Sequence, residues 1–176
     1  HLSIRRQRQM CIRDRYYTME NENNKIDMVY LWCDGNDKEF RERKNSFLTA
    51  DYNIKDEEVS GIKRFFDNEE LRYSLRSLEK YAPWINHVYI VTDRQCPHWL
   101  NTAYEKVSII DHSLIMPQEI IPCFNSNVIE YFLPKIPALS ERFLYANDDF
   151  FLGRTVRPSD FLKMVCQLSE LSLIHI

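Results

Sequence analysis

The chain has 176 residues, of which 44% are hydrophobic and 28% charged, and its formal net charge is −3. This length and composition predict one globular domain with a real core, and exclude a disordered or fibrous chain. A slightly acidic balance lacks the basic surplus of nucleic-acid-binding proteins, so we expect no nucleic-acid partner.

Other sequence features exclude several further classes of site. Five cysteines without CxxC spacing favour free thiols over a zinc site or a disulfide framework. With three glycines there is no Gly-rich phosphate loop. No apolar run reaches the roughly 20 residues that span a bilayer, so we expect no transmembrane segment. We predict a cytoplasmic protein, with peripheral association at the inner face of the cell membrane as an alternative.

Both ends of the chain differ from the rest. Residues 1–18 carry a basic surplus without periodicity, and residues 167–176 end abruptly. We interpret them as a non-native leader and tail around one domain at residues 19–166. The alternative is a genuine basic arm and a genuine C-terminal helix.

The first predicted strand covers residues 26–32, an apolar run rich in β-forming residues. An acidic turn that contains Asp34 and Gly35 follows it. In open α/β sheets, ligands bind at the carboxyl ends of strands, which makes this turn a candidate binding loop. The order of ligands in an EF-hand is absent, so we reject a calcium loop. A solvated helix is predicted for residues 38–47.

The clearest helical pattern covers residues 67–81. Asp67 is predicted as its N-cap, with Glu70 as the capping-box partner, and a leucine stripe forms the apolar face. Arg72 and Arg76 share a different face. Such arginines usually face solvent, but this pair could also contact a substrate phosphate.

Three more strands are predicted at residues 87–92, 106–111 and 143–146. A helix after Phe124 runs to about residue 133, with Asn125 and Ser126 as caps, and another helix starts near Pro158. Strands that alternate with helices or loops indicate an α/β, Rossmann-like (GT-A-like) fold, with a mostly parallel sheet flanked by helices and incomplete in this chain. The polar strand ends are expected to gather along one edge.

Three polar residues, Asn147, Asp148 and Asp149, interrupt an aromatic run that reads as a buried strand. Adjacent carboxylates at a strand end repel each other unless something neutralises them, and a hard divalent cation such as Mg²⁺ is the usual partner. A surface turn is the alternative, because Asn and Asp favour turns.

Several blocks together resemble one family, the Stealth proteins, which are sugar-phosphate transferases of bacterial capsule synthesis and include the GlcNAc-1-phosphotransferase of lysosomal targeting in animals. The resemblance lies in residues 26–37, 65–84, 87–93, 124–130 and 144–151, and covers about 25–161. Cys33 and Phe66 depart from the family pattern. The third and fourth blocks of the family are absent, which indicates an N-terminal fragment.

The resemblance implies transfer of a sugar 1-phosphate from a nucleotide-sugar donor, such as UDP-GlcNAc, to a sugar or polysaccharide acceptor. It implies Asp148 and Asp149 as catalytic residues that bind Mg²⁺ or Mn²⁺. His112 would contact the acceptor or act as a base, although a lone His is more often a packed residue. The residues implied in substrate binding are Asp34, Gly35, Arg72, Arg76, Asn125, Ser126, Glu130 and Asn147. The alternatives are an ordinary glycosyltransferase with a metal-binding acidic motif and an inactive nucleotide-sugar-binding fragment.

Overall fold

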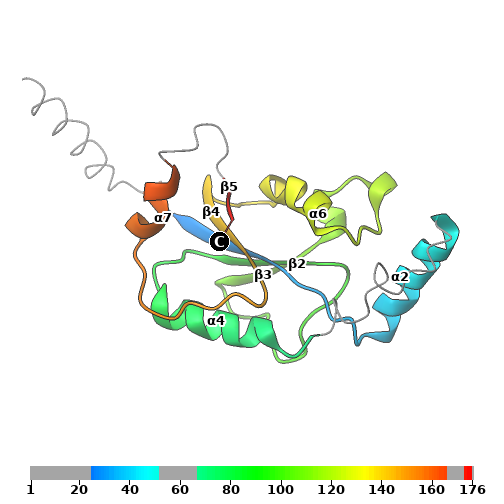
Figure 1. The fold of residues 1–176 in the computed structure, drawn as a ribbon, viewed down its shortest axis with the longest axis horizontal. Helices are drawn as coiled ribbons and strands as arrows, with labels where there is room; N and C mark the ends of the chain where they lie inside the picture. The colour runs from blue at the N-terminus through cyan, green and yellow to red at the C-terminus, as the bar shows by residue number, and fades with distance from the viewer. Residues whose placement is uncertain (1–24, 52–66, 166–172, 176) are drawn as a thin grey trace, which may run out of the picture.

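A single sheet of five parallel strands organises the protein (Figure 1). The computed structural model describes residues 25–51, 67–165 and 173–175. The strand order is β3-β2-β1-β4-β5. The strands are β1 (Ile26–Leu31), β2 (Val88–Thr92), β3 (Val107–Asp111), β4 (Arg142–Asn147) and β5 (Leu173–His175).

Helices cover both faces of this sheet. In Figure 1, α4 (Glu70–Tyr81) lies along one face and α6 (Ser126–Phe132) along the other. The remaining helices are α2 (Lys38–Asp51), α5 (His112–Ile115) and α7 (Pro158–Val165), with the short 3₁₀ helices η2 (Gln118–Ile120) and η3 (Leu133–Lys135). None of the described helices is long and apolar enough to cross a membrane.

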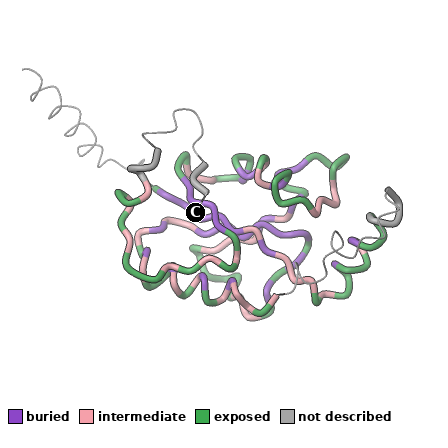
Figure 2. The backbone as a smooth tube through the Cα atoms, in the orientation of Figure 1, coloured by how far each residue is buried: buried purple, intermediate pink, exposed green. Residues whose placement is uncertain are grey.

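The alternation of side chains along the strands divides the core into two layers. Met28 and Tyr30 of β1 pack with Leu71 of α4, whereas Val29 packs on the opposite face with Ile129 of α6. Because a strand buried on both faces needs apolar residues at every position, β1 and β2 read as continuous apolar runs. Figure 2 shows both as buried through most of their length.

The strand order places a topological switch point between β1 and β4. Successive strands run from β1 to β2 to β3 in one direction, and the chain then returns to add β4 on the other side of β1. In open α/β sheets, ligands bind in the crevice outside the carboxyl ends of the strands at such a point. The loops that follow Leu31 and Asn147 are therefore the expected place for a ligand.

The structure confirms the α/β, Rossmann-like fold class and the parallel sheet. Each of the four predicted strands lies within one residue of its observed bounds. Residues 1–18 lie outside the described residues. In the predicted tail, Leu173–His175 pairs with β4, while the proposed non-native origin of residues 167–176 stays a prediction.

One predicted boundary was wrong. The helix begins at Glu70 rather than near Asp67, and Glu69 precedes it with a left-handed backbone, φ 64°. The Asp67 carboxylate accepts a hydrogen bond from the Glu69 backbone N–H at 2.9 Å, and the Glu70 carboxylate accepts from the Asn68 backbone N–H at 2.7 Å. These local bonds form a turn ahead of the helix, so the capping box does not form.

A buried carboxylate joins the amino end of β1 to two loops. Asp27 is fully buried, and its two oxygens accept hydrogen bonds from the Asn86 side-chain amide and the Ser140 backbone N–H, each at 2.7 Å. These partners lie far away in sequence, so Asp27 fixes where β2 and β4 begin beside β1.

We predict that Asp27→Ala lowers the free energy of unfolding by about 3 kcal/mol, because two buried donors lose their acceptor. Urea unfolding measures this value. Glu141→Ala, which truncates an exposed carboxylate next to Ser140, is the control and should change it by less than about 0.5 kcal/mol. Equal stability of the two variants would contradict a structural role for Asp27.

Candidate active site at the carboxyl ends of β1 and β4

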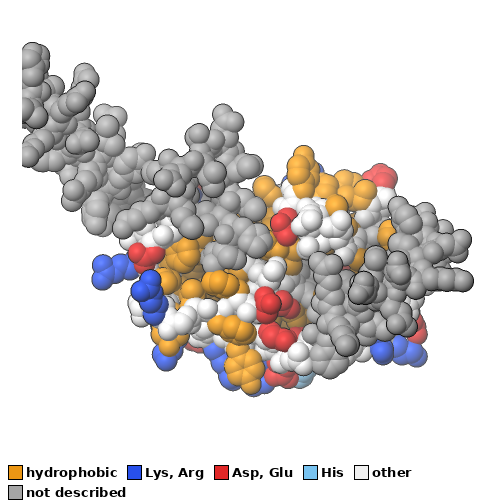
Figure 3. All heavy atoms as spheres, viewed as in Figure 1, with side chains coloured by type: hydrophobic (Ala, Val, Ile, Leu, Met, Phe, Trp, Pro, Cys, Tyr) orange, Lys and Arg blue, Asp and Glu red, His pale blue; other side chains and the backbone are white. Residues whose placement is uncertain are grey.

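Two acidic loops meet at the switch point. Leu31 near the end of β1 is paired in register with Asn147 at the end of β4. The residues that follow each strand therefore start side by side, with Asp34 after β1, and Asp148 and Asp149 after β4. Figure 3 shows Asp and Glu side chains gathered on the viewed face where β4 ends. The expected gathering of polar strand ends is confirmed for these two strands.

The electrostatics of Asp148 show that these carboxylates act on one another. Burial, followed by the charge of Asp149, raises the pKa of Asp148 to about 6, and Asp67 and Glu70 add to the shift. Burial and the charges of Asp34 and Glu70 raise the pKa of Asp67. The site is thus an excess of negative charge at the start of α4, which favours binding of a proton or a cation.

The thiol of Cys33 lies within the same negative field. Burial raises its pKa to about 12, with further contributions from Asp148, Asp34 and Asp67 that exceed any relief from Lys44. This cysteine therefore stays protonated near neutral pH, and a thiolate nucleophile is excluded.

Gln95 holds the loop after β1 in place. Its side-chain oxygen accepts from the Asp34 backbone N–H at 3.0 Å, and its amide donates to the Asp34 carbonyl at 2.9 Å and to the Asp37 carboxylate at 3.0 Å. On the other side, the Asn36 side chain donates to the Asp67 carbonyl at 3.3 Å. The loop that carries Asp34 is therefore connected both to the end of β2 and to the start of α4.

Two serines of α4 hold the segment that follows the acidic pair. The Ser74 hydroxyl donates to the Phe150 carbonyl, and the Ser77 hydroxyl accepts from the Leu152 backbone N–H at 3.0 Å. Further along, the Trp84 indole donates to the Val156 carbonyl at 2.8 Å. Because residues 150–156 are fixed along α4 in this way, the position of Asp149 is set by the helix as well as by β4.

A buried tyrosine connects two of the predicted substrate-binding residues. The Tyr145 hydroxyl lies 3.0 Å from a Glu130 carboxylate oxygen and 3.1 Å from the Asn147 side-chain oxygen. The structure thus brings Glu130 and Asn147 together on the α6 side of the acidic pair. Sequence reasoning missed Tyr145, Ser74, Ser77 and Gln95.

Other predicted site residues lie further from the acidic pair. His112 is buried at the end of β3, and three strand spacings of about 4.8 Å, roughly 14 Å in total, separate β3 from β4. Burial lowers its pKa. Asn125 caps α6 by accepting from the Asn127 backbone N–H at 3.0 Å, so its capping role is confirmed, and the exposed Ser126 opens that helix.

The two arginines and the glycine occupy distinct places. Arg72 forms an ion pair with Glu69 at 2.8 Å, and Arg76 lies one turn further along α4 beside a cavity. Gly35 lies in the turn after Asp34 without a positive φ. Binding roles for these three residues stay predictions.

The donor set fits a hard divalent cation. No group of three or more His, Cys, Asp or Glu side chains within the described ranges is arranged to hold a metal ion. Mg²⁺, however, usually binds one or two carboxylates, several waters and the phosphates of a substrate. Asp148 and Asp149 match that mode, because a cation there would replace the proton that Asp148 otherwise takes up near pH 6. The metal itself stays a prediction.

An α/β domain with an acidic site at the switch point of its sheet is typical of ligand-binding α/β enzymes. Residues 64–169 match the family model described as Stealth protein CR2, conserved region 2. This match covers more than half of the chain, and the chain belongs to the Stealth family.

Curated relatives carry names from polysaccharide synthesis. The chain is 47% identical to the exopolysaccharide phosphotransferase SCO6023 of Streptomyces coelicolor, over 77% of this chain and 23% of the relative. It is 46% identical to the exopolysaccharide phosphotransferase cps2G of Lactiplantibacillus plantarum, over 78% of this chain and 39% of the relative. It is 40% identical to the capsular polysaccharide phosphotransferase fcs1 of Haemophilus influenzae, over 78% of this chain and 38% of the relative. The chain thus spans less than half the length of these relatives.

The raised pKa of Asp148 predicts a pH-dependent effect of its removal. The folded protein holds this proton more tightly than the unfolded chain, whose pKa is 3.8. Protonated Asp148 therefore stabilises the fold below the unfolded pKa, and this stabilisation is lost as pH rises through about 6. In EDTA at pH 7.5, we expect Asp148→Asn to raise the free energy of unfolding by about 2 kcal/mol, with little change at pH 4.

Asp111→Asn is the matched control with the opposite sign. Burial alone would raise the pKa of Asp111, but hydrogen bonds from Ser113 and Arg94 hold this pKa below its usual value. Its contribution is present above the unfolded pKa and lost as pH falls, so this variant should be less stable than wild type at pH 7.5. Urea unfolding at both pH values measures the two effects. If Asp148→Asn changed the free energy of unfolding equally at pH 4 and pH 7.5, Asp148 would not be buried beside a repelling carboxylate.

Proposed function

We propose that this chain carries the acidic centre of an enzyme that transfers a sugar 1-phosphate from a nucleotide-diphospho-sugar, such as UDP-GlcNAc, to a hydroxyl of a sugar or polysaccharide. The product would be a phosphodiester in a capsular or exopolysaccharide. One observation carries this proposal: an acidic pair at the switch point of the sheet, in a chain whose relatives are named polysaccharide phosphotransferases. We place the reaction in the cytoplasm, at or near the inner face of the membrane.

In this reaction the acceptor oxygen forms a bond to the phosphorus that bears the sugar. The bond from that phosphorus to the bridging oxygen breaks, and a nucleoside monophosphate leaves with the electron pair. The acceptor proton passes to a base or to the departing phosphate. Since the protein forms no bond to the phosphorus, its contribution is positioning and neutralisation of charge.

A divalent cation held by Asp148 and Asp149 would supply the positive charge that the diphosphate requires. The chain's own residues supply the geometry. Gln95 fixes the loop of Asp34, and Ser77 fixes the segment after Asp149, so both acidic loops are preorganised before substrate binds. Glu130, joined to Tyr145, offers a carboxylate for sugar hydroxyls on the α6 side.

His112 is poorly placed to act as the base in this reaction. A base has to lie within hydrogen-bond reach of the hydroxyl that it deprotonates. A position three strands from β4 disfavours such contact at a phosphate held by Asp148.

We predict that Asp148→Asn and Asp149→Asn each lower metal-dependent transfer by at least about 100-fold, because each removes charge that binds the cation. Release of nucleoside monophosphate from the nucleotide-sugar measures the rate, in a version of the protein extended to the length of its relatives. Circular dichroism checks that the fold is intact.

Asp160→Asn is the control, since it changes an exposed carboxylate on α7 that accepts a local bond from the Arg157 backbone N–H. It should keep transfer within about twofold of wild type. Wild-type rates in both Asp148→Asn and Asp149→Asn would sink the assignment of the acidic centre.

A further inference from the structure

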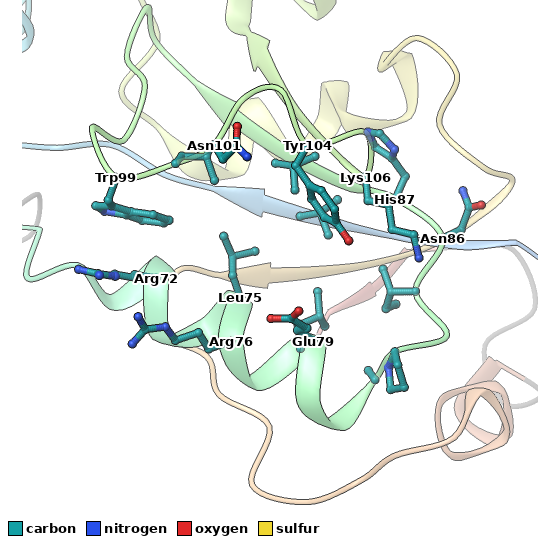
Figure 4. A pocket seen from close by; sticks show the side chains of 17 residues that line it. Arg72, Leu75, Arg76, Glu79, Asn86, His87, Trp99, Asn101, Tyr104 and Lys106 are labelled. Atoms are coloured by element: carbon teal, nitrogen blue, oxygen red, sulfur yellow. The ribbon is translucent and has the colours of Figure 1, made fainter.

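A cavity of about 540 Å³ lies between α4 and the segment that joins β2 to β3 (Figure 4). Its volume is within the range of ordinary ligand sites. Figure 4 shows Arg72 and Trp99 toward one end, Tyr104 and Glu79 further along, and Lys106 and His87 toward the other. The cavity is therefore elongated along the helix.

Its position differs from that of a nucleotide site. One end of the cavity lies by Arg72, which forms an ion pair with Glu69. Glu69 follows closely on Asp67, which belongs to the acidic centre. The other end reaches His87 and Lys106, which precede β2 and β3 and so lie at the amino edge of the sheet. Nucleotides bind open α/β sheets at the carboxyl edge. A ligand that fills this cavity extends away from the acidic centre along α4.

The lining combines aromatic surfaces with hydrogen-bonding groups. Trp99 and the half-exposed Tyr104 provide flat apolar faces, and Asn101 provides an amide. The indole N–H of Trp99 is buried and has no hydrogen-bond partner among the described residues. Sugar rings present apolar C–H faces and hydroxyl edges, which match such a lining.

The charges of the lining favour an anionic ligand. Lys106 and Arg76 line the cavity, and neither forms an ion pair with a described residue, although the Arg76 guanidinium lies over the Tyr73 ring, 5.7 Å from its centroid. Arg72 is already paired with Glu69, and Glu79 is the one acidic side chain in the described lining. The surplus is positive, and guanidinium and ammonium groups are the usual partners of phosphate oxygens.

We propose that this cavity is a saccharide subsite that holds a phosphate-bearing stretch of the acceptor chain, next to but distinct from the acidic centre. The inference rests on the proposed function, because an acceptor extended by phosphodiester transfer carries both sugar rings and phosphates. Trp99 and Tyr104 bind the rings, and Lys106 binds the phosphate. Such a subsite would keep a growing chain in place between successive transfers.

Binding to the 176-residue chain tests this proposal without turnover. The probes are phosphodiester-linked disaccharides of glucose, galactose and N-acetylglucosamine, their neutral glycosidic counterparts, and UMP, all in EDTA. The readout is the indole N–H resonance of Trp99 in a ¹⁵N-labelled sample, assigned with Trp99→Phe. We expect a phosphodiester-linked disaccharide to shift this resonance, and its neutral counterpart to bind more weakly, with a gap that narrows at high salt.

Two variants test the lining, each with a matched control. Tyr104→Ala should weaken binding about fivefold, and Lys106→Gln about threefold. The controls Tyr131→Ala and Lys135→Gln change exposed residues on and beside α6, on the opposite face of the sheet, and should leave affinity unchanged.

Three outcomes would overturn the subsite: no shift of Trp99 with any disaccharide, a shift with UMP alone, or equal affinity in all four variants. Because these measurements need neither metal nor transfer, their failure is distinct from failure of the proposed function. If the cavity bound saccharide but the extended protein catalysed no transfer, the subsite would be supported and the proposed transferase activity would be wrong.

Discussion

Pairing between β1 and β4 is the constraint on which the rest of the structure depends. These strands are more than 100 residues apart in sequence, yet Leu31 and Asn147 are in register. Without that pairing, Asp34 and Asp148 would belong to separate acidic loops, each readily solvated. With it, the charge of Asp34 acts on Asp67, the charge of Asp67 acts on Asp148, and burial raises the pKa of Asp148 to about 6. The fold thus concentrates negative charge where a cation and a diphosphate could be bound.

The helix α4 serves the site in three ways. Leu71 and Leu78 pack on the sheet and fix the helix against β1 and β2. Ser74 and Ser77 hold the segment after the acidic pair. Its third surface, with Arg76, lines the elongated cavity. The same twelve-residue helix therefore connects the core, the acidic centre and the proposed saccharide subsite, so a small shift of α4 would move all three together.

The sequence predicts the strands well because both faces of β1 and β2 are buried, which requires continuous apolar runs. It predicts the acidic pair because carboxylates interrupt such a run at Asp148. It could not predict Gln95 or Ser77, because their hydrogen bonds cross 58 to 75 residues and leave no local pattern. The one available signal for Ser74 and Ser77 was their three-residue spacing within the α4 pattern. The misplaced start of α4 has a local cause, since bonds within residues 67–70 form a turn that competes with the capping box.

The fate of the sugar-bearing phosphorus tests the central claim most directly. A version of the protein extended to the length of its relatives would be incubated with Mg²⁺, a saccharide acceptor and UDP-GlcNAc labelled with ³²P at the phosphorus next to the sugar. Sugar 1-phosphate transfer predicts that the label enters the acceptor as a phosphodiester while unlabelled UMP is released. Recovery of the label in UDP, with none in the acceptor, would contradict the account and identify an ordinary glycosyltransferase.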